Sequence, residues 1–481
     1  MHNLILALLS GAAGGVIIAA VPKISSRFRN LITLLSSALA VVFSWSLALD
    51  IFAGRSIGIS GSLGGLKFTL APDSLGAVFS LIISTLWFFA AVYSMGYMAD
   101  KPRQNTYYIF FLLSLSVGLG VAYAGNLIAL YLFYELLTFV TYPLVIHERT
   151  EEAQKAGKKY ILYNLAGAGL ILAAIVVTIA AAGNADFSAG AILAGREGNG
   201  LNYLLLLFIA GFGVKAAIMP LHRWLPQAMA APTPVSALLH AVAVVYAGVY
   251  GILRVVYSIF GKELTQQLTA GSWLKWIAAF TIIAGILIAA RQDVLKRRLA
   301  YQTISHLSYI LLGAFTLTTR GLSGAILQMI SYSLLKVALF FCAGIIAERT
   351  GQTRISKMEG VGFTVPVTMA AFSAATLGMI GMMPLATFWS KFYLMEGAVM
   401  QGTWPLSLAL IISGMINAIC FIPVIVSAFK GKAAIPSRKA GKEFTLMVVP
   451  TVVLTLLALV IGFFPGAVWP GVEQVVNSFF R

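Results

Sequence analysis

Residues 211–250 read GFGVKAAIMPLHRWLPQAMAAPTPVSALLHAVAVVYAGVY, and this stretch decides how the chain is organised. It places Lys215 in the middle of an apolar segment, follows it with a series of prolines that begins at Pro220, and sets His240 inside the next apolar segment. A lysine near the centre of a bilayer costs about 2.5–3.5 kcal/mol, and a proline removes a backbone hydrogen bond that lipid cannot replace. The stretch therefore predicts a broken membrane helix that carries a functional charge.

The alternative is that Lys215 extends its side chain to the membrane edge beside an ordinary loop. His222 and Arg223 mark that edge, and they lie about seven residues away from Lys215, which is too far for a comfortable reach. The functional interpretation is therefore preferred.

Composition indicates the class of protein. Of the 481 residues, 59% are hydrophobic and 10% are charged, whereas soluble domains carry about 25% charged residues. The chain is therefore expected to lie in a lipid bilayer. Its formal charge of +17 indicates the basic loops of a membrane protein and not a nucleic-acid partner.

Neither a metal site nor a cofactor site is predicted in this chain. The two cysteines, Cys342 and Cys420, lie far apart within apolar segments. They imply no disulfide framework and cannot ligate an iron–sulfur cluster alone. The sequence contains neither a Walker A motif nor a dinucleotide-binding fingerprint, and its first apolar segment lacks the basic leader of a cleavable signal peptide.

Runs of about 20 apolar residues predict an all-α polytopic membrane protein with about 14 transmembrane helices. The predicted spans are 3–21, 30–53, 74–97, 106–124, 126–146, 159–182, 202–224, 233–257, 273–290, 299–319, 323–347, 365–400, 406–429 and 444–465. The segment 54–73 is rich in glycine, with short alternating runs, and predicts a β-hairpin.

Alternate loops between these spans differ in charge. The odd-numbered loops hold most of the Lys and Arg residues, whereas the even-numbered loops hold few, and Arg254 is assigned to one of these. Cytoplasmic loops are enriched in Lys and Arg, so both termini are predicted on the non-cytoplasmic side of the cell membrane. The last odd-numbered loop is especially basic, with Lys430, Lys432, Arg438, Lys439 and Lys442.

Two spans break the helical pattern in corresponding halves of the chain. The seventh carries Lys215 before Pro220, and the twelfth carries Pro384 before Lys391. Broken helices at matching positions are typical of inverted repeats. We therefore predict two inverted five-helix repeats with broken helices 7 and 12. The predicted divisions are an N-terminal three-helix flank (1–105), a first repeat of spans 4–8 (106–257), a second repeat of spans 9–13 (258–430) and a C-terminal span (431–481).

The ionisable residues inside the spans form a candidate proton relay. Their polar neighbours at helical spacing would support a hydrated path, since chains of water need polar partners. The relay candidates are Glu135, Lys215, His240, Lys336 and Lys391, and the possible supporting residues are His306, Tyr246, Tyr332, Thr138, Thr387 and Gln328. The alternative is that these groups satisfy one another as static contacts between helices. A Glu135–Lys215 contact that opens and closes would act as a switch on the proton affinity of the lysine.

The sequence also resembles a known family at these residues, namely the antiporter-like subunits shared by respiratory complex I, membrane-bound hydrogenases and Mrp-type sodium/proton antiporters. The resemblance runs over nearly the whole chain and in one order of motifs. These motifs are YELLTFVTYPL, KYILYN, GFGVKAAIMPLHRWLPQAMAAPTPVSALLHA, DVLKRRLAYQTISHLSY, LLKVALFFCAG and GMMPLATFWSKF.

The resemblance implies fourteen core helices, two inverted five-helix repeats and a line of charged residues at mid-membrane. It also implies roles for matching residues. Glu135 and Lys215 look like the coupling pair of the family, His240 like its connecting histidine, Lys336 like its central lysine and Lys391 like its exit lysine. The chain departs from the pattern at two positions, which changes the composition of the central relay. Tyr246 stands where other branches carry a lysine, and Tyr332 where the distal complex I pump subunit has a histidine.

These observations predict a proton-translocating subunit of a multisubunit membrane complex. The expected partners are other membrane subunits, the lipid bilayer and H⁺. One interpretation couples the chain to a hydrophilic redox module, as in complex I or a hydrogenase, and another couples it to Na⁺ antiport without redox partners. A third, from another class, is a membrane scaffold that transports nothing.

Overall fold

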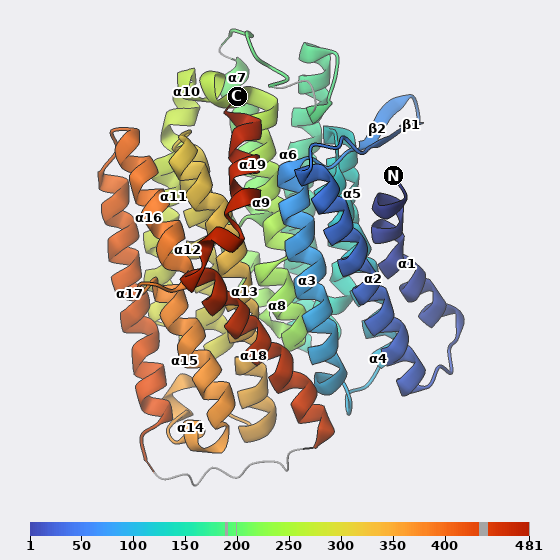
Figure 1. Ribbon diagram of the computed structural model, residues 1–481, viewed down its shortest axis with the longest axis vertical. Coiled ribbons are helices and arrows are strands. Elements are labelled where there is room, and N and C mark those ends of the chain that lie inside the picture. The colour runs from blue at the N-terminus through green and yellow to red at the C-terminus, as the bar shows by residue number, and fades with distance from the viewer. Residues whose placement is uncertain (188–190, 199, 432–440, 481) are drawn as a thin grey trace.

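Long apolar helices make up nearly all of the structure, a computed structural model that describes residues 1–187, 191–198, 200–431 and 441–480. Eleven of its helices are long and apolar enough to cross a membrane. The all-α, polytopic class predicted from composition is therefore confirmed, and Figure 1 shows the helices packed side by side along one common direction.

The elements of the first half are α1 His2–Ala20, α2 Ser26–Phe52, β1 Ile59–Leu63, β2 Leu66–Leu70, α3 Ser74–Tyr97, α4 Gln104–Tyr123, α5 Leu127–Val145, α6 Glu151–Ala182, α7 Gly200–Lys215, α8 Thr233–Ala241, α9 Val244–Arg254 and α10 Gly261–Gln267. Those of the second half are α11 Thr269–Ala290, α12 Leu295–Phe315, α13 Thr319–Thr350, α14 Val361–Thr364, α15 Pro366–Ile380, α16 Ala386–Met400, α17 Pro405–Ala428, α18 Lys442–Phe463 and α19 Trp469–Phe479. Each predicted span contains one or two of these helices. The figure of about 14 spans, the inverted repeats and the four divisions of the chain stay predictions.

The predicted hairpin is confirmed. Strands β1 and β2 pair antiparallel, with Leu63 opposite Leu66. The two residues between them, Gly64 and Gly65, both have positive φ, +58° and +83°. A tight two-residue hairpin turn requires this conformation, and glycine adopts it without steric cost.

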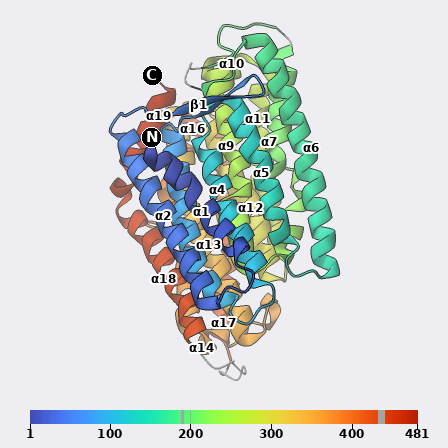
Figure 2. The same cartoon turned by 90° about the vertical axis from the view of Figure 1, so that its right-hand side faces the viewer.

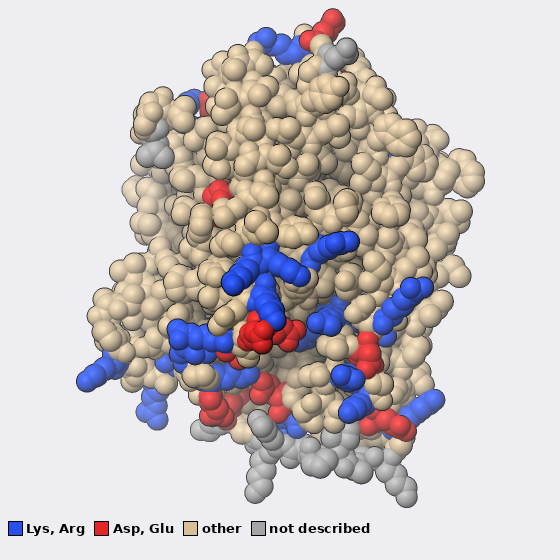
Figure 3. Space-filling view, turned by 180° about the vertical axis from the view of Figure 1, so that it is seen from behind, with Lys and Arg blue, Asp and Glu red and all other residues tan. Residues whose placement is uncertain are grey.

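The two ends of the bundle differ in charge. Both termini and the hairpin lie toward one end (Figures 1 and 2). Seen from behind, Lys, Arg, Asp and Glu gather toward the opposite end, beneath a broad uncharged surface (Figure 3). Three basic residues predicted in the last loop, Lys432, Arg438 and Lys439, lie outside the described residues. The molecule therefore has an end rich in charge, called the charged end below, and an end that holds both termini.

Helix α13 occupies the centre of the bundle. It packs against α8, α12, α15, α16 and α18, and nearly all of its apolar stretch is buried. Every residue of α8 and α9 is also buried, whereas α1, α6 and α17 present apolar side chains outward. Polar side chains on α13 and α8 are therefore shielded from lipid by other helices.

Helix breaks occur where prolines predict them and also where none does. Helix α7 ends at Lys215, five residues before Pro220, and two short 3₁₀ turns follow. Helices α15 and α16 are separated by a break that contains Pro384. A third break, at Val242 and Ala243 between α8 and α9, was not predicted. The predicted eighth span is thus two helices, with His240 just before the break.

The sequence-based assignment of Arg254 to a loop is wrong. Arg254 is the last residue of α9 and is 1% exposed. Its guanidinium forms a two-fold ion pair with Asp73, with N–O distances of 2.5 and 2.6 Å, and it also donates to the Tyr250 hydroxyl. The partner stands 181 positions away in sequence, so nothing local to Arg254 could have indicated the pair.

Candidate functional site

Lys215 is fully buried at the C-terminal end of α7. Its ammonium donates a hydrogen bond to the backbone carbonyl of Tyr134 on α5, and its Nζ lies 3.4 Å from the centroid of the Tyr134 ring. The negative end of the α7 dipole and the π face of the ring both favour a cation there. The break after α7 thus places this ammonium beside α5.

Glu135, the predicted partner of Lys215, follows Tyr134 directly but forms no ion pair with Lys215 in the described structure. Lys215 nevertheless binds the carbonyl of Tyr134, the residue before Glu135 in the chain. Glu135 Oε1 and Thr138 Oγ1, one turn further along α5, are buried and have no hydrogen-bond partner among the described residues. The structure therefore brings the predicted pair together as neighbours and leaves the lysine on a backbone carbonyl.

His240 lies on α8, fully buried, and packs against Phe340 of α13 with ring centroids 5.5 Å apart. Neither of its ring nitrogens has a hydrogen-bond partner among the described residues. Lys336 Nζ lies 5.6 Å from the centroid of the same Phe340 ring, so His240 and Lys336 flank one aromatic side chain. A buried imidazole without protein partners is the kind of group that ordered water satisfies.

Lys336 lies near the middle of α13 and is 0% exposed. Its ammonium donates to the backbone carbonyl of Leu299, at 2.6 Å, and to Gln302 Oε1, at 2.8 Å, both on α12. Gln302 was not among the predicted supporting residues. The central lysine is therefore anchored on the neighbouring helix.

Asn417 on α17 extends this contact and was missed by sequence reasoning. Gln302 Nε2 donates to Asn417 Oδ1, at 2.7 Å. The Asn417 amide nitrogen lies 3.3 Å from the Met379 carbonyl and 3.4 Å from His306 Nε2. Asn417 is 1% exposed. The sequence did not indicate it as a site residue, because a single uncharged amide in a long apolar run belongs to no recognisable motif.

Lys391, on α16, is the last of the predicted relay lysines along the chain and is 8% exposed. Its ammonium reaches back across the helix break and donates to the carbonyls of Met379, at 3.1 Å, and Ile380, at 2.6 Å. Met379 is therefore the shared acceptor of Asn417 and Lys391. Breaking the helix exposes these carbonyls because a continuous helix would engage them in its own hydrogen bonds.

His306 connects the same groups by a second route. Its Nδ1 lies 3.0 Å from Gln328 Nε2, and Gln328 Oε1 accepts a hydrogen bond from Ser390, the residue before Lys391. The imidazole is stacked between Tyr309 and Tyr332, each with a ring centroid 5.0 Å away. His306 and Gln328, both predicted as support, are therefore part of the network.

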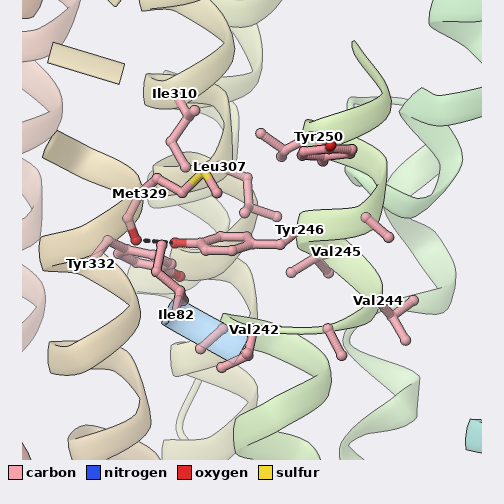
Figure 4. Packing of buried hydrophobic residues seen from close by; sticks show 14 of the residues in the cluster. Ile82, Val242, Val244, Val245, Tyr246, Tyr250, Leu307, Ile310, Met329 and Tyr332 are labelled. Carbon is pink, nitrogen blue, oxygen red and sulfur yellow. Dashed lines mark hydrogen bonds between the residues drawn. The ribbon is translucent and has the colours of Figure 1, made fainter. Parts of the chain in front are cut away.

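The remaining predicted support residues lie around this network. Thr387 donates to the Gly378 carbonyl and so ties α16 to α15. Tyr246 donates to the Met329 carbonyl of α13 at 2.9 Å and points at that helix beside Tyr332 (Figure 4). The Tyr332 hydroxyl is buried without a partner among the described residues.

A continuous set of direct hydrogen bonds thus joins Lys336 to Lys391 through Gln302, Asn417 and the Met379 carbonyl. Every side chain in it is buried. This network holds the Lys336 and Lys391 ammonium groups and the His306 imidazole in fixed positions. Amide side chains and a backbone carbonyl do not relay protons themselves, so transfer between the ionisable groups needs water beside the network.

Known proteins resemble this chain over most of its length. A family described as "NADH:quinone oxidoreductase/Mrp antiporter, TM" matches residues 124–417, which is more than half of the chain and contains every relay candidate. The chain belongs to this family. The resemblance drawn from the motifs is therefore confirmed. A second family, described as "NADH-Ubiquinone oxidoreductase (complex I), chain 5 N-terminus", matches residues 61–108.

Relatives of this antiporter-family chain come from both branches named in the family description. It is 31% identical to NADH-quinone oxidoreductase subunit N of Desulforudis audaxviator (strain MP104C), over 92% of this chain and 91% of the relative. It is 27% identical to a Na(+)/H(+) antiporter subunit of Bacillus subtilis (strain 168), over 92% of this chain and 90% of the relative.

Solved structures show the same fold. A chain of the membrane-bound sulfane sulfur reductase, an archaeal respiratory membrane complex, superimposes with a TM-score of 0.90 at 22% identity, over 100% of this chain and 98% of the other. A chain of the Mrp complex from Dietzia sp. DQ12-45-1b superimposes with a TM-score of 0.87 at 18% identity, over 100% of this chain and 97% of the other. A chain of respiratory complex I from Thermus thermophilus superimposes with a TM-score of 0.86 at 22% identity, over 99% of this chain and 98% of the other.

Proposed function

We propose that this chain is a proton-translocating subunit of a multisubunit membrane complex. The observation that carries the proposal is the buried hydrogen-bonded line from Lys336 to Lys391, which lies inside a helix bundle with an apolar outer surface. Ammonium groups are costly in a membrane interior, and ionisable residues there commonly mark proton or ion pathways.

The direction of transfer follows from the charge of the two ends. The charged end faces the cytoplasm of the cell, because cytoplasmic loops are enriched in Lys and Arg, and both termini lie on the other side. A proton enters near Lys215 or His240, passes by His240 and water to Lys336, continues to Lys391 and leaves at the opposite face. The family resemblance assigns the same order of residues.

Lys215 and Glu135 form the switch. In this structure Lys215 rests on the Tyr134 carbonyl, which corresponds to the open state of the pair. Closing it to about 4 Å at an effective dielectric constant of about 20 gains roughly 4 kcal/mol. Moving one charge through 100 mV costs about 2.3 kcal/mol. The free-energy difference between the closed and the open pair therefore exceeds the cost of moving one proton through 100 mV, so a partner that drives the pair between its two states can move a proton against a membrane potential.

The energy source lies in partner subunits. The relatives of this chain are named as subunits of a redox enzyme in one case and of a Na(+)/H(+) antiporter in the other. Either a hydrophilic redox module or a sodium gradient therefore drives this chain. We expect no cofactor in the chain itself. Identification of the subunits that co-purify with it separates the two, because flavin-binding or iron–sulfur subunits support the redox-driven complex.

Proton movement by the assembled complex in sealed vesicles tests the proposal. Replacing Lys215 or Glu135 by alanine should abolish most of the proton movement while the complex still assembles, because each change removes one side of the switch. Unchanged proton movement in both variants would remove the pair from the mechanism.

A further inference from the structure

A hollow of about 400 Å³ opens at the charged end, between the end of α3, the end of α13 and the beginning of α18. Charged residues from all three regions line it, among them Lys101, Glu348, Arg349 and Glu443. The volume is that of several water molecules, at about 30 Å³ each. It lies on the side from which the proposed function draws its protons.

An ion pair stands in this hollow. Lys101 and Glu348 are 2.7 Å apart and partly exposed, with 25% and 33% of their side chains accessible. The Lys101 ammonium also lies 3.7 Å from the centroid of the Tyr97 ring. Burial opposes the charge of Lys101, but Tyr97 and Glu348 outweigh that effect and raise its pKa above the ordinary value. Lys101 is therefore protonated at neutral pH, and it holds the Glu348 carboxylate beside open water.

Arg349 adds unsatisfied polar groups to the same hollow. Its guanidinium stacks on Phe444, 4.6 Å from the ring centroid. Its Nε and Nη1 are buried without a hydrogen-bond partner among the described residues. Buried polar groups without protein partners favour ordered water. We therefore expect water to fill the hollow up to the Arg349 guanidinium.

Polar contacts continue from the hollow toward His240. The Thr233 hydroxyl lies 3.4 Å from the Tyr97 hydroxyl, to which it donates. Thr233 begins α8, which carries His240 about 10 Å further along its axis at 1.5 Å per residue. Tyr97 therefore contacts the hollow through Lys101 and the helix of the relay histidine through Thr233.

We propose that this hollow is the proton entrance of the subunit, with Glu348 as the group that takes up the proton and Tyr97 and Thr233 on the side that leads toward His240. The inference rests on the proposed function and adds the uptake site to it. When Glu348 leaves Lys101, its carboxylate binds a proton from bulk water. It gives that proton through water, past the Tyr97 and Thr233 hydroxyls, to a ring nitrogen of His240, and the Glu348 carboxylate forms again.

A conservative exchange at Glu348 tests the entrance. The assembled complex is placed in sealed vesicles, and the initial rate of proton movement is measured at neutral and at alkaline pH. Glu348→Gln should lower the rate about tenfold at alkaline pH, where protons are scarce, and less at neutral pH. Formate added to the bulk solution should restore the rate, because a small weak acid replaces the missing carboxyl group, and Glu348→Asp should retain most of the activity.

Asp50→Asn is the matched control. Asp50 forms an ion pair with Arg55 of the same 2.7 Å length, but at the end that holds the termini, and its loss should leave the rate unchanged. A Glu348→Gln complex with wild-type rates at alkaline pH would overturn the inference. So would a loss that is equal at both pH values and not restored by formate, since it would make the pair a structural clamp. Absence of proton movement in the wild-type complex would instead overturn the proposed function itself.

Discussion

The two halves of the relay are built differently. From Glu135 to His240, buried polar atoms lack protein partners among the described residues, and Lys215 rests on a backbone carbonyl. From Lys336 to Lys391, direct hydrogen bonds join one side chain to the next, with Asn417 at the centre. The first half therefore depends on water and on a movable charge, whereas the second half is assembled by the fold.

This difference separates two tasks. A switch needs groups that can exchange partners, and a buried group without a fixed partner can do so at low cost. A conductor needs groups that stay within hydrogen-bond distance, and a satisfied buried network is rigid. The first half suits the coupling step and the second suits passage to the opposite face.

Among substitutions of uncharged residues, the largest expected effect is in the second half. Asn417→Leu leaves the Gln302 amide without its acceptor and cuts the contact to the Met379 carbonyl. The groups that lose their partner move from their fixed positions, and a misplacement of about 1 Å can cost roughly 100-fold in rate, so proton movement in vesicles should fall about tenfold or more.

Ser413→Ala provides the control for Asn417→Leu. Ser413 lies one turn earlier on α17, is equally buried and makes only a 3.4 Å contact to Ser305. Its loss should change the rate less than about twofold on the same reasoning. Equal effects of the two substitutions would show that Asn417 holds α17 in place and has no part in conduction.

A smaller effect is expected in the first half. Thr138→Val keeps the shape of a buried side chain whose hydroxyl has no partner among the described residues. Water near Glu135 can rearrange around the change, so the rate of proton movement should change less than about twofold, well below the Asn417→Leu effect. A tenfold loss in the same vesicle measurement would make Thr138 a fixed member of the path and remove the contrast between the halves.

The smallest effect is expected at Tyr246, beside the point where the two halves of the relay meet. Tyr246→Phe removes only the hydrogen bond to the Met329 carbonyl. The thermal stability of the purified complex should fall by an amount equivalent to about 0.5–1.5 kcal/mol, with proton movement nearly unchanged. If proton movement instead falls strongly while stability is kept, Tyr246 carries protons in the position where other branches of the family have a lysine.

Much of the fold could be predicted because lipid imposes a simple rule on sequence. Apolar runs of membrane length identified the helices, and a glycine-rich segment with short alternating runs indicated the hairpin. The break between α8 and α9 could not be predicted, because Val242 and Ala243 carry no proline or glycine and the break depends on packing inside the bundle. Arg254 was misplaced for a related reason, since only the fold brings Asp73 to it.

The candidate site divides in the same way. Lys215, His240, Lys336 and Lys391 could be selected because a charge within an apolar run is conspicuous. Asn417 could not, because an amide in such a run is ordinary and its partners lie on other helices. The pairing of Lys336 with Gln302 likewise depends on how α12 and α13 pack, which residue spacing along one helix does not determine.

The account depends on buried ammonium groups that conduct protons, and the most direct measurement replaces them together. The complex carrying Lys215→Met, Lys336→Met and Lys391→Met is assembled, checked for its full set of subunits and assayed for proton movement in sealed vesicles. The account predicts that the altered chain no longer moves protons while the complex still assembles. Proton movement at the wild-type rate would contradict it and would make the chain a scaffold for its neighbours.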